Sequence, residues 1–249
     1  ILKERFHAKN QKSLQLKFHT QTSGESLTAQ QPDNNIVRVA MQTMASVLGG
    51  TQSLHTNSRD EALALPTEES AKIALRTQQI VAHESGITKT VDPMGGSHYL
   101  EELCDEIEEQ TWKYLKRIDK MGGSLKAIDK GFFQAEIRQN AYRLKKEVDD
   151  NSRILVGVNK FADEIEAKQK LLRIDDSLGR KQEKAIKALR KSRDSKKTDR
   201  ALSKLQSAAD TDENLMPLIL NSVKAYATTG EISNTLREVF GEYRPKEIF

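Results

Sequence analysis

Polar side chains that suit ligand binding follow a short alternating run near the start of the chain. Gln21 lies between two threonines, and its amide both donates and accepts hydrogen bonds, which suits a carbonyl or carboxylate ligand. His19 precedes it at the spacing that places both side chains on the same side of a strand. The histidine alone is more typical of a structural group, and the glutamine is also explained by tying its loop. Spacing leaves both interpretations open.

A second polar stretch repeats this form further along the chain. Gln52 and Asn57 bracket it, and Glu61 follows. A carboxylate near a strand end can bind a pair of sugar hydroxyls or act as a base, whereas a glutamate in the first turn of a helix stabilises that helix. In the first stretch, Gly24 either lets a planar ligand approach the backbone or is a plain turn glycine.

Two strand–loop–helix units must position these residues. Leu14 to Phe18 alternates apolar and polar residues as a strand does, and residues 51–57 form the second strand and its loop. A helix is predicted between them, ending at Gly49, and a second helix runs from Thr67 to about Glu84. The apolar stripe of the first helix is Ile36, Val37, Ala40, Met41, Met44, Val47 and Leu48. This order predicts a parallel α/β repeat, and polar residues past strand ends line the active-site mouth of a (β/α)8 barrel.

The rest of the chain is predicted to be mostly helical. Helices are expected from Ser97 to Met121 and again around residues 133–148, while residues 154–158 form a strand or a buried extended arm. Trp112 and the tyrosines fall on helical stripes, so we expect them in the core. Residues 161–212 are highly charged with a thin apolar stripe, which predicts a long solvated helix pair. Two more helices follow, one capped by Asp212 and one from Glu231 to Phe240.

Composition limits the classes of function. The 249 residues are 37% hydrophobic and 31% charged, and no apolar run approaches the roughly 20 residues of a membrane span. The single cysteine and the lack of a signal peptide suit a cytoplasmic protein with no membrane partner. The net charge of +4 is modest. The basic run 184–204 contains acids and no aromatics, so a solvated helix face is favoured over nucleic-acid binding.

Several long motifs together carry a family resemblance. They are FHTQTSG (18–24), SLTAQQPDNNIVR (26–38), GGTQSLHTNSRDEALALPT (49–67), VDPMGGS (91–97) and VGVNK (156–160), with a tail over 213–245. The chain resembles the adenosylcobalamin-dependent acyl-CoA mutases, the family of the methylmalonyl-CoA mutase large (alpha) subunit. The resemblance covers at least residues 14–161, and the tail is similar to the end of the large subunit in two-subunit forms.

The resemblance implies a fold and a division of the chain. The fold class is α/β, the C-terminal portion of a (β/α)8 TIM barrel with its last two strand–helix units, followed by a mostly helical C-terminal region. Residues 1–86 would form these units, 87–160 a helical extension packing on the barrel, and 161–249 a charged helical region. We therefore expect a piece of a longer catalytic chain. Alone, it should be poorly soluble or misfolded, because its open sheet edge leaves backbone groups unpaired.

The resemblance also assigns roles to individual residues. Substrate contacts, to the acyl group and to CoA or the deoxyadenosyl group, are implied for His19, Gln21, Gln52 and Asn57. Cofactor contacts, to the corrin ring or the adenosyl ribose, are implied for Gly24, Glu61, Ala62 and Ala64. No catalytic residue and no metal ligand is assigned in this chain. The sequence departs from common family residues at Glu25, Arg59, Ala64 and Met94.

The implied activity is radical carbon-skeleton isomerisation of an acyl-CoA with adenosylcobalamin as cofactor. The signature Asp-x-His-x-x-Gly, which supplies histidine to cobalt, does not occur in these residues, so a separate cobalamin-binding domain or small subunit is the expected partner in a homo- or hetero-oligomer. Methylmalonyl-CoA is the favoured substrate, and isobutyryl-CoA, hydroxyisobutyryl-CoA and ethylmalonyl-CoA stay open. A non-catalytic truncated subunit and a basic helical nucleic-acid binder are the alternatives from other classes.

Overall fold

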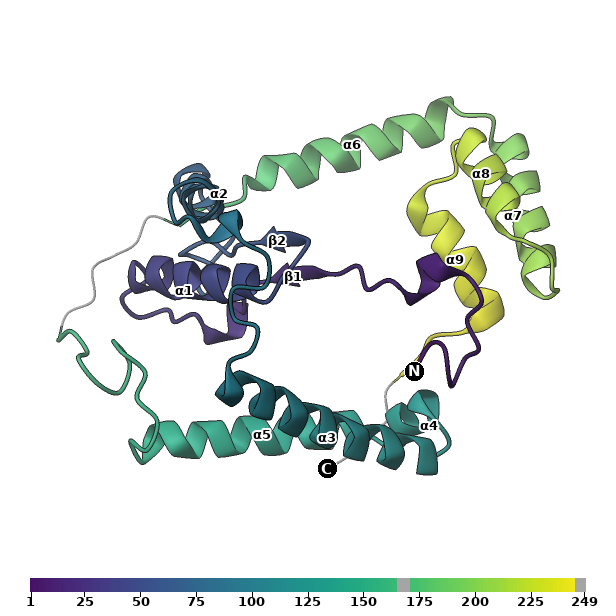
Figure 1. Cartoon of the computed structure of the whole chain (residues 1–249). Helices are drawn as coiled ribbons and strands as arrows, with labels where there is room; N and C mark the ends of the chain where they lie inside the picture. The colour runs from purple at the N-terminus through teal and green to yellow at the C-terminus, as the bar shows by residue number, and fades with distance from the viewer. Residues whose placement is uncertain (165–170, 245–249) are drawn as a thin grey trace. The chain divides into compact units, whose positions relative to one another are not determined.

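The computed structural model describes residues 1–164 and 171–244, and the chain divides into two compact units. The first unit is Ile1–Leu172, and the second is Arg173–Phe249. Figure 1 shows the first unit with two short strands beside helices α1 and α2, and the second unit as helices alone. No helix within the described residues is both long and apolar enough to cross a membrane.

The two strands pair in parallel, as the strand–helix–strand order predicted. Strand β1 is His19–Gln21 and β2 is Ser53–His55, with His19 opposite Ser53 and Gln21 opposite His55. Helix α1, Asn34–Leu48, lies between them in the chain, and α2, Glu68–His83, follows β2. The result is two consecutive β–α units of an α/β protein.

The predicted first strand was placed too early. Residues Gln11–Leu14 form a 3₁₀ helix (η1), and the pairing with β2 begins only at His19. The side chain of Gln52 accepts a hydrogen bond from the Phe18 amide at 2.7 Å and donates to the Leu16 carbonyl at 3.2 Å. These backbone groups are therefore taken by a side chain instead of by a ladder, and Leu16 is 78% exposed.

Helices α1 and α2 pack together through small and polar side chains. The buried positions fall at spacings of three or four residues on each helix: Asn35, Val39 and Thr43 on α1, and Ser70, Ala74, Thr77 and Val81 on α2. Part of the predicted α1 stripe is therefore wrong, because Val37 is 58% and Met41 is 69% exposed. At the start of α2, the Thr67 hydroxyl accepts a hydrogen bond from the Ser70 amide at 3.2 Å, which is the predicted N-cap.

The next three helices form a hairpin-like group connected to α2 through the 3₁₀ turn η3, Ile87–Lys89. They are α3 (His98–Lys120), α4 (Ser124–Asp129) and α5 (Phe132–Asp149). The Tyr114 hydroxyl donates to Glu136 at 2.7 Å, and Arg117 pairs with the same carboxylate at 3.1 Å. Within the described chain, α3 buries none of its residues.

The predicted aromatic core is wrong in this group. Trp112 and Tyr114 are exposed by 36% and 40%, and Tyr99 and Tyr142 by more than 70% each. Phe132 is buried instead, in contact with Tyr114 and under the Arg117 guanidinium at 4.8 Å. The physical reason is that few elements pack against α3, so an apolar stripe at helical spacing has nothing to cover it.

Residues 154–161 form an extended arm with a tight turn that returns to the first β–α unit. Arg38 donates to the Val156 carbonyl at 2.7 Å, and Gln31 donates to the Phe161 carbonyl at 2.8 Å. Gly157 has φ +82, and a Cβ there would lie 2.8 Å from the Gln31 side-chain oxygen. Of the two predicted forms, strand or buried arm, the structure has an extended arm, with only an isolated bridge between Val156 and Lys160. The arm is not buried as predicted, because Ile154 and Val156 are 43% and 45% exposed.

The second unit consists of four described helices. They are α6 (Asp176–Ser192), α7 (Ser195–Ala209), α8 (Met216–Lys224) and α9 (Thr229–Phe240). Helices α6 and α7 are the predicted charged pair, although α7 also buries Leu205, Ala208 and Ala209 against α8 and α9. The predicted cap at Asp212 is wrong, because the N-cap of α8 is Leu215. The last helix begins slightly before the predicted Glu231, at Thr229, because Thr228 and Glu231 form a capping box.

Candidate ligand site at the strand ends

Four of the predicted site residues meet at the carboxyl ends of β1 and β2. The Gln21 amide donates to the Asn57 side-chain oxygen at 3.4 Å. A Cβ added to Gly24 would lie 2.8 Å from the Asn57 amide nitrogen and 3.6 Å from Cγ of Glu61. The loop after β1 and the loop after β2 are therefore in direct contact, and these four residues mark the contact.

Asn57 is at the centre of this group and is only 2% exposed. Its backbone N–H donates to the Thr22 hydroxyl at 2.9 Å, and the Thr22 N–H donates to the His55 carbonyl at 3.1 Å. The Asn57 side-chain nitrogen has no hydrogen-bond partner among the described residues. A buried donor left unpaired costs about 1–3 kcal/mol, so this N–H is suited to an acceptor on a ligand.

Gly24 has a structural explanation that the sequence did not reveal. It begins the 3₁₀ turn η2, Gly24–Ser26, and its missing side chain leaves room for the Asn57 amide. Of the two explanations that the sequence left open, the turn accounts for this glycine, and close approach of a planar ligand stays a prediction. The absence of a side chain at Gly24 also leaves the space beside Glu61 open, and Glu61 is exposed.

Two buried polar residues that sequence reasoning did not select hold the loops in place. The Asn35 side chain on α1 donates to the Thr28 carbonyl at 2.8 Å and to the Arg59 carbonyl at 2.9 Å. Asp60 accepts from the Thr67 amide at 3.1 Å. The available signal was a polar residue at a core-facing helical position for Asn35, and an acid shortly before a helix N-terminus for Asp60.

The pKa of Asp60 reflects these contacts. Burial alone would raise the pKa of this carboxyl, but the polar groups around it, the Ser58 hydroxyl, the Thr67 amide and the Ser70 hydroxyl, outweigh burial and lower the pKa. Asp60 is thus a charged residue that fixes the second loop to α2, and we give it no part in acid–base chemistry. The loop is also tied by Thr56, whose hydroxyl donates to the Ala74 carbonyl at 2.8 Å.

Arg59, one of the positions where the sequence departs from common family residues, is held by two acids. Its guanidinium pairs with Asp33 at 2.6 Å and lies 3.8 Å from Glu69, and its side chain is only 23% exposed. Arg59 therefore connects the second loop to the start of both α1 and α2. Glu25 is exposed in η2, and Met94 is 42% exposed.

The remaining predicted residues lie at the edges of the group. Ala62 is exposed and Ala64 half-buried in the loop that follows Glu61. His19 begins β1, and its Nδ1 is hydrogen-bonded to the Ser53 hydroxyl at 2.7 Å. Gln52 precedes β2, so it lies at the amino end of the strand pair, opposite the end that carries Asn57. Gln52 therefore lies near His19, which pairs with Ser53 at the same end, and apart from Asn57 and Glu61. Its ligand role stays a prediction.

The chemistry available here is binding by neutral groups beside one carboxylate. Amides and hydroxyls hold polar ligand atoms by hydrogen bonds, and Glu61 can accept from a pair of hydroxyls. Among residues 1–164 and 171–244, no group of three or more His, Cys, Asp or Glu is arranged to hold a metal ion. The fold and site together define an α/β protein with a candidate ligand site, a polar cluster at the carboxyl ends of adjacent parallel strands.

Comparison with known proteins places this chain in a family. The family model described as Methylmalonyl-CoA mutase matches residues 1–242. The chain therefore belongs to the methylmalonyl-CoA mutase family, and the resemblance found in the motifs is confirmed.

Three relatives show the extent of the similarity. Mitochondrial methylmalonyl-CoA mutase of Mus musculus is 45% identical over 249 residues, covering 99% of this chain and 33% of the relative. Methylmalonyl-CoA mutase of Rhizobium meliloti is 45% identical over 242 residues, covering 96% and 34%. The 2-hydroxyisobutanoyl-CoA mutase large subunit of Aquincola tertiaricarbonis is 41% identical over 251 residues, covering 100% and 45%. The chain thus spans between a third and a half of these relatives.

Proposed function

We propose that this chain contributes the last two strand–helix units of a (β/α)8 barrel to an adenosylcobalamin-dependent acyl-CoA mutase. The reaction we favour is interconversion of methylmalonyl-CoA and succinyl-CoA. The observation that carries the proposal is the meeting of Gln21, Gly24, Asn57 and Glu61 at the carboxyl ends of β1 and β2. Ligand sites of such barrels lie at this end of the strands.

In this proposal the neutral residues bind the acyl-CoA. Gln21 is exposed, and its amide donates a hydrogen bond to the Asn57 side-chain oxygen. The orientation of Gln21 is therefore partly fixed before a ligand binds. A side chain held in this way loses less freedom on binding a thioester carbonyl or an acyl group. The His19 ring is held by its hydrogen bond with Ser53 of β2, and its side chain is on the same face of β1 as Gln21. We assign His19 a contact with the acyl-CoA.

Two features of the site fit the adenosyl part of the cofactor. The exposed Glu61 carboxylate beside Gly24 suits the two hydroxyls of a ribose, and the unpaired Asn57 N–H suits an acceptor atom next to them. Glu61, Asn57 and the loop residues Gly24, Ala62 and Ala64 would hold the group. Adenosylcobalamin, when bound, supplies the radical chemistry of the rearrangement, while the protein orients the substrate and excludes water.

The partner we propose is a separate cobalamin-binding domain or small subunit that supplies the cobalt ligand. The Aquincola relative is named as a large subunit, which supports a division of the enzyme over two chains. The same relative acts on a hydroxyisobutanoyl-CoA, while the relatives at 45% identity are methylmalonyl-CoA mutases. Isobutyryl-CoA, hydroxyisobutyryl-CoA and ethylmalonyl-CoA are therefore the alternative substrates, and a non-catalytic subunit is the alternative role.

The test is reconstitution with a choice of substrates. The large subunit that carries this sequence is mixed with a cobalamin-binding chain and adenosylcobalamin, and the products from methylmalonyl-CoA, isobutyryl-CoA, hydroxyisobutyryl-CoA and ethylmalonyl-CoA are followed by mass spectrometry. We expect succinyl-CoA from methylmalonyl-CoA as the fastest reaction. Faster turnover of another acyl-CoA would make that compound the proposed substrate. No turnover of any of the four acyl-CoAs would favour the non-catalytic role.

A further inference from the structure

A groove with no assigned function runs along helices α7 and α8 of the second unit. Two neighbouring hollows of about 430 Å³ each share the lining residues Lys204 and Leu218. We call this the α7–α8 groove and define it by Lys197, Arg200, Ala201, Lys204, Leu218 and Lys224. Each hollow is within the size range of small-molecule sites, about 300–1,000 Å³.

The groove is lined by four cations that come from both helices. Lys197, Arg200 and Lys204 occupy one face of α7, because successive residues turn by roughly 100° and these three fall within roughly 60°. Lys224 is in the last turn of α8. None of the four forms an ion pair in the described chain, whereas other cations of this unit do, such as Arg193 with Glu231 at 2.6 Å.

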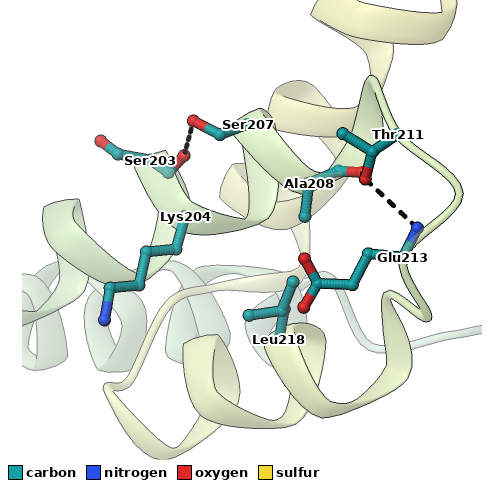
Figure 2. Close-up of a pocket in the computed structure, with 7 residues that line it drawn as sticks. All are labelled: Ser203, Lys204, Ser207, Ala208, Thr211, Glu213 and Leu218. Atoms are coloured by element: carbon teal, nitrogen blue, oxygen red, sulfur yellow. Dashed lines mark hydrogen bonds between the residues drawn. The ribbon is translucent and has the colours of Figure 1, made fainter.

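Two of the nearby acids, Asp199 and Glu213, lie away from this face. Asp199 lies roughly opposite Lys197 on the α7 helical wheel, about 200° away. Glu213 belongs to the other end of the groove, and Figure 2 shows the Lys204 side chain extending away from it. The Glu213 backbone N–H is held by the Thr211 hydroxyl at 3.2 Å, which fixes that end. No acidic residue lines the hollow that holds the four cations, although the Asp194 carboxylate at the start of α7 accepts from the Lys197 backbone N–H at 3.0 Å.

The floor between the cations is apolar. Ala201 and Leu218 are half-buried there, and Ala225 is only 4% exposed. A planar or aliphatic group can rest on this surface while its charged groups reach the lysines and the arginine. None of the lining residues is aromatic, so the groove lacks the stacking side chains with which proteins bind single-stranded nucleic acid.

We propose that the α7–α8 groove binds a small ligand that carries two or more phosphate groups. The phosphates lie on Lys197, Arg200, Lys204 and Lys224, and the organic part lies on Leu218 and Ala201. Arginine binds phosphate through two parallel hydrogen bonds, and lysine adds point charge. Two ligands have this chemistry, a free nucleoside triphosphate and the adenosine 3′,5′-bisphosphate end of an acyl-CoA. The proposal is independent of the function proposed for the strand-end site.

The test measures direct binding to the large subunit that carries this sequence. Affinities for ATP, for adenosine 3′,5′-bisphosphate and for inorganic tripolyphosphate are measured by calorimetry at low and moderate salt. We expect binding that weakens with salt, since its main contribution is charge. Tighter binding of ATP identifies a nucleotide site, and tighter binding of the bisphosphate identifies a site for CoA. Tripolyphosphate should bind more weakly than whichever ligand also covers Leu218.

Matched variants separate the groove from general positive charge. R200Q/K204Q removes two groove cations and should weaken binding about tenfold or more. K181Q/K184Q removes two exposed cations from α6 and should change affinity by less than about threefold. If R200Q/K204Q fails to fold, K197Q/K224Q takes its place with the same expectation. Absence of binding by the native chain, or equal losses in the groove and α6 variants, would overturn the proposal.

Discussion

Substitution of Gly24 by alanine tests the contact between the two loops directly. The new methyl group would lie 2.8 Å from the buried Asn57 amide nitrogen, closer than normal carbon–nitrogen contact, and its other neighbour, Glu61 Cγ, lies at an ordinary 3.6 Å. The backbone of Gly24 is not in the left-handed region, so alanine brings no backbone strain there. The whole effect should therefore come from Asn57.

The expected cost follows from this overlap. Forcing one extra methyl group into a packed site costs about 1–3 kcal/mol, and Asn57 has little room to yield because Thr22 and Gln21 hold it on two sides. G49A is the matched control. Its methyl group would meet its nearest atom, the Ala45 carbonyl oxygen, at 3.4 Å, and Gly49 has φ −78. We expect G49A to change the free energy of unfolding by less than about 0.5 kcal/mol.

A double-mutant cycle in urea completes this test. In the N57A background the clash partner is gone, so G24A should cost less than about 0.5 kcal/mol, which gives a coupling of about 1 kcal/mol or more between the two sites. The measurement is the midpoint and slope of urea unfolding for the four proteins. The reasoning is refuted if G24A costs the same in both backgrounds, or if it is no more destabilising than G49A.

Three further predictions concern charge and capping. The pKa of Glu231 is lowered to about 2 from 4.5, chiefly by its hydrogen bonds from Arg193. The charged carboxylate should therefore stabilise the fold by about 3 kcal/mol above pH 4.5, and this stabilisation should be lost as the pH falls toward 2. Urea unfolding of the native chain and E231Q against pH checks this, and parallel pH curves would contradict it. T67A should cost about 1 kcal/mol by removing the α2 cap, whereas T67S should cost much less. R59M keeps the aliphatic stem but loses the ion pair with Asp33, so it should lower the free energy of unfolding by about 1 kcal/mol or less. This destabilisation should become smaller in 1 M salt, whereas a purely packing effect would not change.

The parallel strand pair and its helices could be predicted from the sequence because their signals are local. Period-two and helical patterns, the Thr67 cap and the Gly49 stop all act within a few residues, and the order of the elements dictates a parallel sheet. The start of β1 was missed because a strand exists only where a partner strand is in register. That register depends on β2, and on Gln52 occupying the backbone groups before His19.

The site could be predicted only in part, for similar reasons. Motif resemblance selected Gln21, Asn57 and Glu61, and the structure brings them together with Gly24. The motifs could not show that Asn57 keeps an unpaired N–H, since that depends on the distance between two loops. The predicted aromatic core failed because burial depends on what packs against a helix. Helix α3 has the periodicity of a core helix and buries none of its residues within the described chain.

The central claim is that Gln21 and Glu61 bind different parts of one reacting complex. It is tested most directly by measuring, in the reconstituted large subunit, the Kd for adenosylcobalamin and the KM for the acyl-CoA in Q21A, E61Q and a control, E102Q, on the exposed surface of α3. The account predicts that E61Q weakens adenosylcobalamin binding about tenfold or more, that Q21A raises the KM for the acyl-CoA by a similar factor, and that E102Q changes neither. Unchanged constants in both site variants, or the same change in all three, would contradict it.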